Sequence, residues 1–465
     1  MTNRQKGQII ELDIERLAFG GAGIGKHDGM TVFVEKTVPG DRVRASFFKI
    51  KNNYAEANLT EIVTPSTDRI KPRCSYSGAC GGCQMMFMPY EKQLAFKQQH
   101  VIDALERIGK IPNPPVEKII GSKDRFFYRN KMEFTFGYDS KMNFTLGLHQ
   151  PGFRFDILDI NECHLQSELS VKIVNSAREL VKKLKWPPFK YSNGEGFLRS
   201  LIIRDCKRTG EVMVILNTSD QIPKNLAEGL KKFVELMAGF KEVVSIFHLS
   251  IISRRGMPNK IKETMLYGRP AITEKMILEN GDELDFTISP QAFFQVNTFQ
   301  AEILYNNVLK MASSRPQELV LDFFCGIGTI GLFMAKHAEK VLGIELNEEA
   351  VKAAKKNAQR NDISNIEFNT GDVVENLPAI RQKPSLIVVD PPRAGLTGNL
   401  IDIIGGLGAN QLVYVSCDPA TLARDCDQLK RHGFMLKKVQ PVDMFPHTFH
   451  IENVCLLEKH CLLEK

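Results

Sequence analysis

The strongest constraint on the fold is a set of five short apolar runs within residues 317–417. They are separated by segments of helical periodicity and read ELVLDFF, KVLGIEL, NIEFNTG, SLIVVD and QLVYVSC. Strands that alternate with helices usually run parallel and form an open sheet with helices on both faces. Such sheets bind ligands at the carboxyl ends of their strands. The sequence therefore predicts a doubly wound α/β domain with a site at that edge.

The rest of the chain predicts two further domains, because 465 residues are too many for one core. Residues 1–63 alternate short β-rich runs with Gly and Asp turns, which is typical of a small OB-like antiparallel barrel. Residues 64–285 indicate a central α+β domain, and the α/β domain covers 286–465. Within the central domain we expect strands in 125–163 and helices near 89–109, 167–185 and 223–238.

The positive charge is concentrated in the middle of the chain. Residues 63–285 contain 34 Lys and Arg against 26 Asp and Glu, whereas the whole chain has a net charge of +7. An anionic partner such as RNA would explain this excess, and so would a solvated surface. The barrel adds side chains of the types that bind single-stranded nucleic acid, namely Phe47, Phe48, Lys49, Lys51 and Tyr54. Packing of the barrel against its neighbour is the alternative.

Hydropathy and cysteine content indicate a protein of the cytoplasm. The sequence shows neither a membrane-spanning apolar segment nor a signal core near its first residues, so we expect no membrane partner. Ten cysteines are too few for a disulfide scaffold in a chain of this length. In a reducing compartment they suggest metal binding or catalysis.

A glycine-rich turn follows the first of the five runs, in LDFFCGIGTIGLFMA. Gly326, Gly328 and Gly331 allow the backbone to approach a ligand closely at a helix N-terminus. Glu345 ends the next strand, 23 residues after Asp322, where it can accept hydrogen bonds from ribose hydroxyls. This combination predicts a nucleoside cofactor, and NAD and S-adenosylmethionine both remain possible.

The segment VVDPPRAG, at the end of the fourth run, distinguishes between these two cofactors. Its acid followed by Pro-Pro resembles the (Asp/Asn)-Pro-Pro motif of methyltransferases that act on nucleobases. A proline-stiffened loop in which Asp390 caps a helix is the alternative. With the glycine turn upstream, the motif favours S-adenosylmethionine.

A cysteine stands at the end of the fifth run, in LVYVSCDPATL. Cys417 is either a core residue or a nucleophile at the active edge of the sheet. C5 of uracil is a weak nucleophile, and a thiolate that adds to C6 makes C5 reactive enough to accept a methyl group. Such catalysis needs a thiolate of lowered pKa and a base for the C5 proton. Glu452, beside His447 and His450, is a candidate base or a surface carboxylate, and Cys325 is a rival nucleophile in the cofactor turn.

Four segments in order, DFFCGIGT, DPPRAG, VSCDPATL and FPHTFHIE, together resemble the RNA uracil-5-methyltransferases. The segment from GAGIG to PGDRV resembles a TRAM domain, which is an RNA-binding barrel. CSYSGACGGCQ resembles the cluster segment of the iron–sulfur branch that modifies 23S ribosomal RNA. The resemblance covers nearly the whole chain apart from a repeated CLLEK in its last eleven residues. It implies three domains along the chain, namely the barrel, a central iron–sulfur domain and a Rossmann-like S-adenosylmethionine-dependent methyltransferase domain.

The resemblance also implies roles for individual residues. Cys417 would be the nucleophile and Glu452 the proton acceptor. The positions that match the S-adenosylmethionine contacts of the family are Gln295, Phe324, Thr329, Glu345, Asp372 and Asp390. The side chains that we expect around a flipped base, from residue type and position, are Phe293, Phe294, Arg129 and Lys131.

Cys74, Cys80 and Cys83 follow C-x5-C-x2-C spacing, and Cys163 is a remote fourth candidate ligand. Four thiolates suit zinc or an iron–sulfur cluster, and His164 keeps a Cys3His zinc site possible. The resemblance implies a [4Fe–4S] cluster with a structural or RNA-organising role. We expect packing or surface positions for Cys206, Cys426, Cys455 and Cys461.

The expected activity is therefore methylation of C5 of a specific uridine in a loop or unpaired segment of 23S rRNA, giving 5-methyluridine. Methylation of a tRNA uridine is the nearest alternative, although the barrel and the cysteines argue against it. A non-catalytic RNA-binding assembly factor is a second alternative. A radical enzyme is disfavoured because C-x3-C-x2-C is absent from the sequence. Nothing in the sequence demands more than a monomer.

Overall fold

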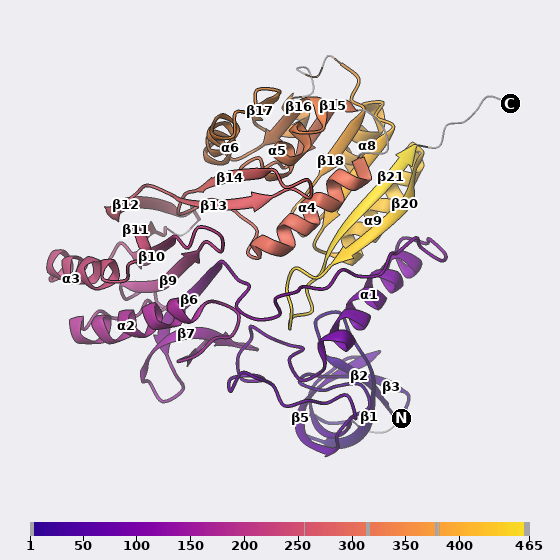
Figure 1. The fold of residues 1–465 in the computed structure, drawn as a ribbon. Helices are drawn as coiled ribbons and strands as arrows, with labels where there is room; N and C mark the ends of the chain where they lie inside the picture. Colours follow the sequence, from indigo (N-terminus) through magenta and orange to yellow (C-terminus); the bar gives the residue numbers. More distant parts are fainter. Residues whose placement is uncertain (1–3, 255, 313–316, 377–379, 381, 460–465) are drawn as a thin grey trace.

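The computed structural model describes residues 4–459 except 255, 313–316, 377–379 and 381. A barrel, a central sheet with helices on one face and a C-terminal sheet follow one another along the chain (Figure 1). Helix α1 (Tyr90–Arg107) lies beside the C-terminal sheet and connects the barrel to the rest of the chain. The closed N-terminal barrel and the mixed α/β architecture confirm the predicted fold class, while the iron–sulfur character of the central domain stays a prediction.

The barrel closes in the order β1-β2-β3-β5-β4. Its strands are β1 (Ile9–Leu17), β2 (Gly23–His27), β3 (Met30–Val34), β4 (Arg42–Ile50) and β5 (Tyr54–Thr64). Alternate side chains point inward, since successive residues of a strand face opposite sides. Phe47 belongs to this core and is 2% exposed, so its predicted contact with a base is wrong. Phe48 is 45% exposed and is available at the surface.

The central sheet has seven strands in the order β12-β11-β10-β9-β6-β7-β8. Helices α2 (Glu168–Leu184) and α3 (Leu226–Ala238) cover one face and lie close to two of the predicted ranges. The strands are β6 (Lys131–Tyr138), β7 (Phe144–Gln150), β8 (Phe153–Asp159), β9 (Leu198–Asp205), β10 (Val212–Ser219), β11 (Val243–Ile252) and β12 (Lys260–Gly268).

A two-stranded hairpin, β13 (Ile272–Ile277) and β14 (Glu283–Ile288), packs against the other face of this sheet. Its side chains share one hydrophobic core with β9–β11 and with the C-terminal sheet. The predicted boundary at residue 285 falls inside β14. The hairpin therefore joins the central and C-terminal parts through apolar packing.

The C-terminal sheet has the order β17-β16-β15-β18-β19-β21-β20. The strands are β15 (Gln317–Phe323), β16 (Ala338–Glu345), β17 (Ile366–Thr370), β18 (Leu386–Val389), β19 (Gln411–Ser416), β20 (Phe434–Val442) and β21 (Glu452–Lys459). The first five strands pair in parallel, as the five apolar runs predict. The helices are α4 (Thr298–Ala312), α5 (Thr329–Ala335), α6 (Glu348–Arg360), α7 (Val373–Asn376), α8 (Gly398–Gly406) and α9 (Pro419–Leu429). Strand β21 runs antiparallel between β19 and β20.

The segment 443–449, which connects β20 to the residues before β21, is held by a buried polar network. Lys97 of α1 is fully buried and donates to Asp443 Oδ1 at 2.6 Å and to the Phe445 carbonyl at 3.0 Å. The Tyr90 hydroxyl donates to Asp443 Oδ2 at 2.7 Å. The Tyr128 hydroxyl donates to the Pro446 carbonyl at 3.1 Å. Helix α1 and the central domain thus fix the path of the chain toward β21.

None of the described helices is long and apolar enough to span a membrane. The nine cysteines of the described residues are all free. Cys206, Cys426 and Cys455 are buried, in agreement with a packing role. Cys461 and the second CLLEK lie outside the described residues.

Candidate active site

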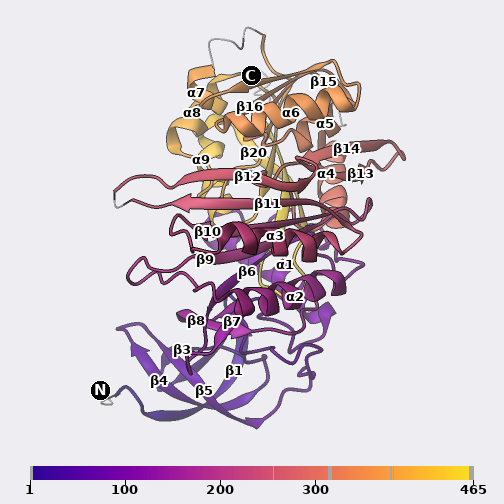
Figure 2. The same cartoon turned by 90° about the vertical axis from the view of Figure 1, so that its left-hand side faces the viewer.

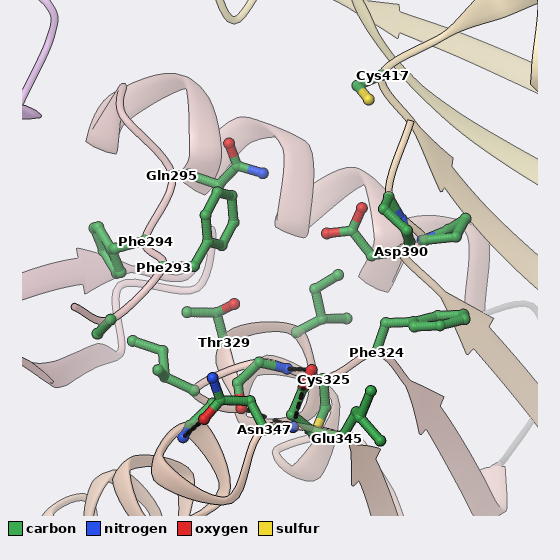
Figure 3. Close-up of a pocket in the computed structure, with 18 of the residues that line it drawn as sticks. Phe293, Phe294, Gln295, Phe324, Cys325, Thr329, Glu345, Asn347, Asp390 and Cys417 are labelled. Atoms are coloured by element: carbon green, nitrogen blue, oxygen red, sulfur yellow. Dashed lines mark hydrogen bonds between the residues drawn. The ribbon is translucent and has the colours of Figure 1, made fainter. Parts of the chain in front are cut away.

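A pocket of about 1380 Å³ opens at the carboxyl ends of β15, β16, β18 and β19 (Figure 3). This is the edge at which the sequence predicts a site. The pocket is lined by all eight residues that the sequence analysis assigns to catalysis or to the cofactor, namely Gln295, Phe324, Thr329, Glu345, Asp372, Asp390, Cys417 and Glu452.

The glycine-rich turn forms one wall of the pocket. The Gly326 N–H donates to Glu345 Oε2 at 3.1 Å, and the Asn347 N–H donates to Oε1 at 2.8 Å, so the carboxylate is fixed at the end of β16. Gly328 precedes α5 with φ of +84°, in the left-handed region that favours glycine. A Cβ there would lie 2.7 Å from Cζ of Phe368. The turn therefore needs glycine for both conformation and space.

The other predicted cofactor residues surround this turn. Phe324 has φ of +65°, and the Thr329 hydroxyl donates to the Tyr305 hydroxyl at 3.3 Å. Gln295 is buried in the segment before α4, and Asp372 is exposed after β17. Carboxylates at the ends of neighbouring strands suit both the ribose hydroxyls and the ammonium group of S-adenosylmethionine. The polar side chains around the turn therefore fit S-adenosylmethionine.

The strand register brings the predicted nucleophile and the predicted base together. β19 pairs with β21 antiparallel, and the recorded ladder ends with Ser416 opposite Asn453. Cys417 and Glu452 are the next residues on the two strands, so they lie across from each other at the pocket. Asp390 directly follows β18, which neighbours β19, and it points toward the same space in Figure 3.

The electrostatics of this group differ from the expected lowered thiol pKa. Burial, and after it the Glu452 carboxyl group, raises the pKa of Cys417 to about 12. Burial also raises the pKa of Asp390 to about 7, and burial together with Asp390 raises the pKa of Glu452 well above its usual value. The expectation is therefore wrong for the enzyme without RNA, because two acidic groups face the thiol in a poorly solvated space.

The acids are opposed by the cation of Arg393, for which no role is predicted from the sequence. Arg393, in the DPPRAG motif, lowers the pKa of both Cys417 and Glu452. Its Nη2 lies 3.2 Å from Nδ1 of His450, and burial and Arg393 lower the pKa of that imidazole to about 4. The sequence signal for a role of Arg393 is a positively charged residue directly after Pro-Pro. Asp322, buried beneath the glycine turn with a pKa raised to about 8 by burial, was also missed.

Three of the four side chains expected around a flipped base line the pocket. Phe293 is 68% exposed at its mouth, and Arg129 lies near Phe445 with its guanidinium 5.9 Å from the ring centre. Phe294 is buried against Phe286. Lys131 begins β6 and is absent from the described lining of the pocket.

The four predicted cluster ligands come together beside the central sheet. Cys74, Cys80 and Cys83 lie on a loop whose Cys80 N–H donates to the Tyr76 carbonyl at 2.8 Å, and Cys163 follows β8. Burial raises the pKa of the Cys83 thiol, and so do the nearby thiols of Cys163 and Cys80. Within the described residues, no three potential ligands converge on the position of a single metal ion. The thiols are thus neighbours without forming a mononuclear site.

The comparisons with known proteins identify the family. The profile described as tRNA (uracil-5-)-methyltransferase matches residues 210–460, and the TRAM domain profile matches residues 3–60. An RNA methyltransferase of Clostridium acetobutylicum is 38% identical over 456 residues, 98% of each chain. One of Halalkalibacterium halodurans is 37% identical over 459 residues, 97% of each chain.

The chain belongs to the tRNA (uracil-5-)-methyltransferase family. It is an S-adenosylmethionine-dependent RNA uracil-5-methyltransferase with an N-terminal TRAM barrel. A solved structure of the same architecture is the Pyrococcus abyssi tRNA (uracil-54, C5)-methyltransferase in complex with S-adenosyl-L-homocysteine. It is 26% identical, with a TM-score of 0.75, over 96% of this chain and 100% of that chain.

Proposed function

We propose that this uracil-5-methyltransferase acts on a uridine of 23S rRNA and converts it to 5-methyluridine. The chemistry rests on one observation, the meeting of Cys417, Glu452 and Asp390 in a pocket that also contains the cofactor residues. A non-catalytic assembly factor would not need this arrangement. We further propose that the enzyme acts as a monomer in the cytoplasm.

In the proposed reaction the Cys417 thiolate adds to C6 of the flipped uracil, and the electron pair moves to C5. Bound S-adenosylmethionine would supply the methyl group to C5, with cleavage of its bond to sulfur and S-adenosylhomocysteine as the leaving group. Glu452 then takes the proton from C5, and the C6–S bond breaks to restore the ring and the thiolate. The raised pKa of Glu452 makes its carboxylate a stronger base than an ordinary one, which suits removal of a proton from carbon.

The cofactor residues form the proposed S-adenosylmethionine site. Glu345 accepts hydrogen bonds from ribose hydroxyls, and Asp372 lies at the end of the neighbouring strand. Phe324 and Thr329 line the glycine turn, while Gln295 and Asp390 lie on the side of Cys417. This division supports a position of the methyl donor between the turn and the reacting base.

We also propose that Cys74, Cys80, Cys83 and Cys163 bind a [4Fe–4S] cluster. A zinc ion draws four sulfur atoms to about 2.3 Å from one point. Four cysteine thiolates are the usual ligands of a [4Fe–4S] cluster, and the thiols of Cys74, Cys80 and Cys163 lie near enough to Cys83 to raise its pKa further than burial does. The loop also donates the N–H groups of Gln84 and Met85 to the His447 carbonyl at 3.0 and 2.9 Å. A cluster would thereby stabilise the 443–449 segment that leads to Glu452.

The barrel and the cysteine quartet support rRNA as the substrate, but tRNA is a second candidate with its own observation. The Pyrococcus abyssi enzyme is named for a tRNA uridine, and its whole chain is matched by this one. The three-part architecture therefore occurs in a tRNA-modifying enzyme, and the barrel alone does not exclude tRNA.

Tritium release from C5-labelled uridine in 23S rRNA and in tRNA tests the proposal. Both RNAs are incubated with S-adenosylmethionine and anaerobically prepared enzyme, and Cys417→Ala is the control. We expect release from 23S rRNA that the substitution abolishes. Release from tRNA alone would keep the chemistry and overturn the substrate, whereas no release from either RNA would overturn the activity.

A further inference from the structure

A buried tyrosine hydroxyl borders the part of the pocket that contains the glycine-rich turn. Tyr305 lies on α4, which packs between the β13–β14 hairpin and the C-terminal sheet (Figure 1 and Figure 2). Its side chain is only 2% exposed, yet it belongs to the lining of the pocket. Its ring meets the ring of Phe333 of α5 edge-on, with the ring centres 5.4 Å apart. The phenol is therefore held in one position beside α5.

The hydroxyl of Tyr305 has one recorded partner, and that contact uses the oxygen atom. The Thr329 hydroxyl donates to it at 3.3 Å, and within the described residues no acceptor for the Tyr305 proton is recorded. Burial raises the pKa of Tyr305, and so do the carboxyl groups of Asp390, Glu452 and Asp322. The phenol therefore keeps its proton at neutral pH and can donate one further hydrogen bond. Because a buried donor without an acceptor is unfavourable, an acceptor from a ligand would complete the site.

Tyr305 and Thr329 lie between the places that suit the ribose and the transferred methyl group. In the sheet, β15 and its turn lie between β16, which ends at Glu345, and β18, which leads to Asp390. Figure 3 shows Thr329 between the turn and Gln295. The sulfur atom of S-adenosylmethionine carries the methyl group, the adenosyl group and the methionine chain. With the ribose at Glu345, the amino-acid end of that chain would lie over the start of α5.

The charges that line the pocket indicate which ligand group the Tyr305 proton meets. The described lining contains two arginines and no lysine, and both arginines, Arg129 and Arg393, contribute after burial to the low pKa of His450. They therefore lie on the side of Phe445 and His450, away from the glycine turn. A carboxylate bound at the turn needs neutral donors, whereas an ammonium group already has carboxylates nearby. A free hydroxyl proton there suits the carboxylate.

We propose that Tyr305 binds the carboxylate of the methionine part of S-adenosylmethionine, with its hydroxyl as the hydrogen-bond donor. Thr329 donates to the same hydroxyl and thereby fixes its orientation. Tyr305 thus selects a cofactor that has an intact amino-acid end. This inference rests on the proposed cofactor site, and it is independent of which RNA the enzyme methylates.

Tyr305→Phe removes only the hydroxyl, and three ligands show which group it contacts. S-adenosylhomocysteine has the carboxylate and the ammonium group, its decarboxylated analogue keeps only the ammonium group, and methylthioadenosine has neither. Calorimetry should show about tenfold weaker binding of S-adenosylhomocysteine by the variant. The other two ligands should bind to the variant as they bind to the wild type.

Tyr414→Phe is a matched control. Tyr414 of β19 is also fully buried, but its hydroxyl donates to Asp425 Oδ2 at 2.8 Å, and its side chain packs on the face of the sheet opposite that of Val413 and Val415. This variant should bind all three ligands like the wild type, even if it is less stable. Glu345→Ala tests the proposed site itself, because loss of the ribose contact should weaken all three ligands together.

The outcomes separate this inference from the proposed cofactor site. Wild-type affinity of Tyr305→Phe for S-adenosylhomocysteine would overturn the inference, while the Glu345→Ala comparison still tests the site. Equal weakening of all three ligands by Tyr305→Phe would show a purely structural role and would also overturn it. Weaker binding of the decarboxylated analogue, with methylthioadenosine unaffected, would assign Tyr305 to the ammonium group and overturn its contact with the carboxylate.

Discussion

Cys417 is half-buried at the pocket, in an environment that favours the protonated thiol. Its pKa is raised to about 12 by burial, then by Glu452, whereas Arg393 acts in the opposite direction. The resting enzyme therefore keeps the proposed nucleophile as the thiol, and the thiolate forms only in a small fraction of molecules at neutral pH. Arg393 is the cation that increases this fraction.

This balance predicts a pH dependence. Because the thiol pKa lies far above neutrality, kcat/KM should rise from about pH 6.5 to about pH 9 without a plateau. Arg393→Ala should raise the thiol pKa further and lower the rate at every pH, and Arg393→Lys should recover part of it. Single-turnover methylation over this range measures the effect. A plateau near neutral pH in the wild type would contradict the prediction.

Glu452 acts late in the proposed reaction, after the methyl group has reached C5. Glu452→Gln should therefore stop the enzyme with C6 still bonded to Cys417, and a covalent RNA–protein complex should accumulate. Denaturing gel electrophoresis with labelled RNA detects it. The double variant with Cys417→Ala should form none, and a Glu452→Gln enzyme that turns over normally would remove Glu452 from the mechanism.

At the scale of elements, the buried Lys97–Asp443 pair joins α1 to the 443–449 segment. Lys97→Met leaves the Asp443 carboxylate buried without its cation, which should lower the free energy of unfolding by about 3–5 kcal/mol. Adding Asp443→Asn should recover part of this loss. Urea denaturation compares the variants, and a change below about 1 kcal/mol in the single variant would contradict the assignment.

The glycine turn provides a second element-scale prediction. Gly328→Ala places a side chain in the left-handed region, which costs about 1–2 kcal/mol, and it also contacts Phe368. We expect lower stability and weaker binding of S-adenosylhomocysteine, measured by calorimetry. Gly398→Ala is the control, because a Cβ there has no described atom within 4 Å and the position begins α8.

Most of the fold could be predicted from local patterns of apolar residues in the sequence. The apolar runs gave β15–β19 and the edge that holds Cys417, and three helical periods gave α1–α3. The antiparallel position of β21 between β19 and β20 was not predicted, because register between distant strands depends on tertiary packing. For the same reason the contact of Lys97 with Asp443 could not be read from the sequence. The DPPRAG motif shows a basic residue after Pro-Pro, but the effect of Arg393 on Cys417 and Glu452 depends on the tertiary structure.

At the scale of the whole molecule, His447 connects the cysteine loop to the segment 443–449 that leads to Glu452. Its carbonyl accepts the backbone N–H groups of Gln84 and Met85, which directly follow Cys83. We expect about four iron atoms per chain in anaerobically purified enzyme. Cys83→Ala should lose the iron, lower the melting temperature and reduce methylation, since the 443–449 segment loses its anchor. Cys206→Ala, at a buried cysteine away from the quartet, should retain iron. Zinc without iron in the wild type would contradict the assignment.

The position of β21 also has a consequence for the folding of the enzyme during its synthesis on the ribosome. Every other described strand is synthesised before β21, yet β20 joins the C-terminal sheet only through it. While β21 is still inside the ribosome, the sheet ends at β19, β20 has no neighbour in that sheet, and Cys417 lacks Glu452 across from it. The nascent protein therefore gains its last two strands in one late step, and under the proposed mechanism it should not methylate RNA before that step.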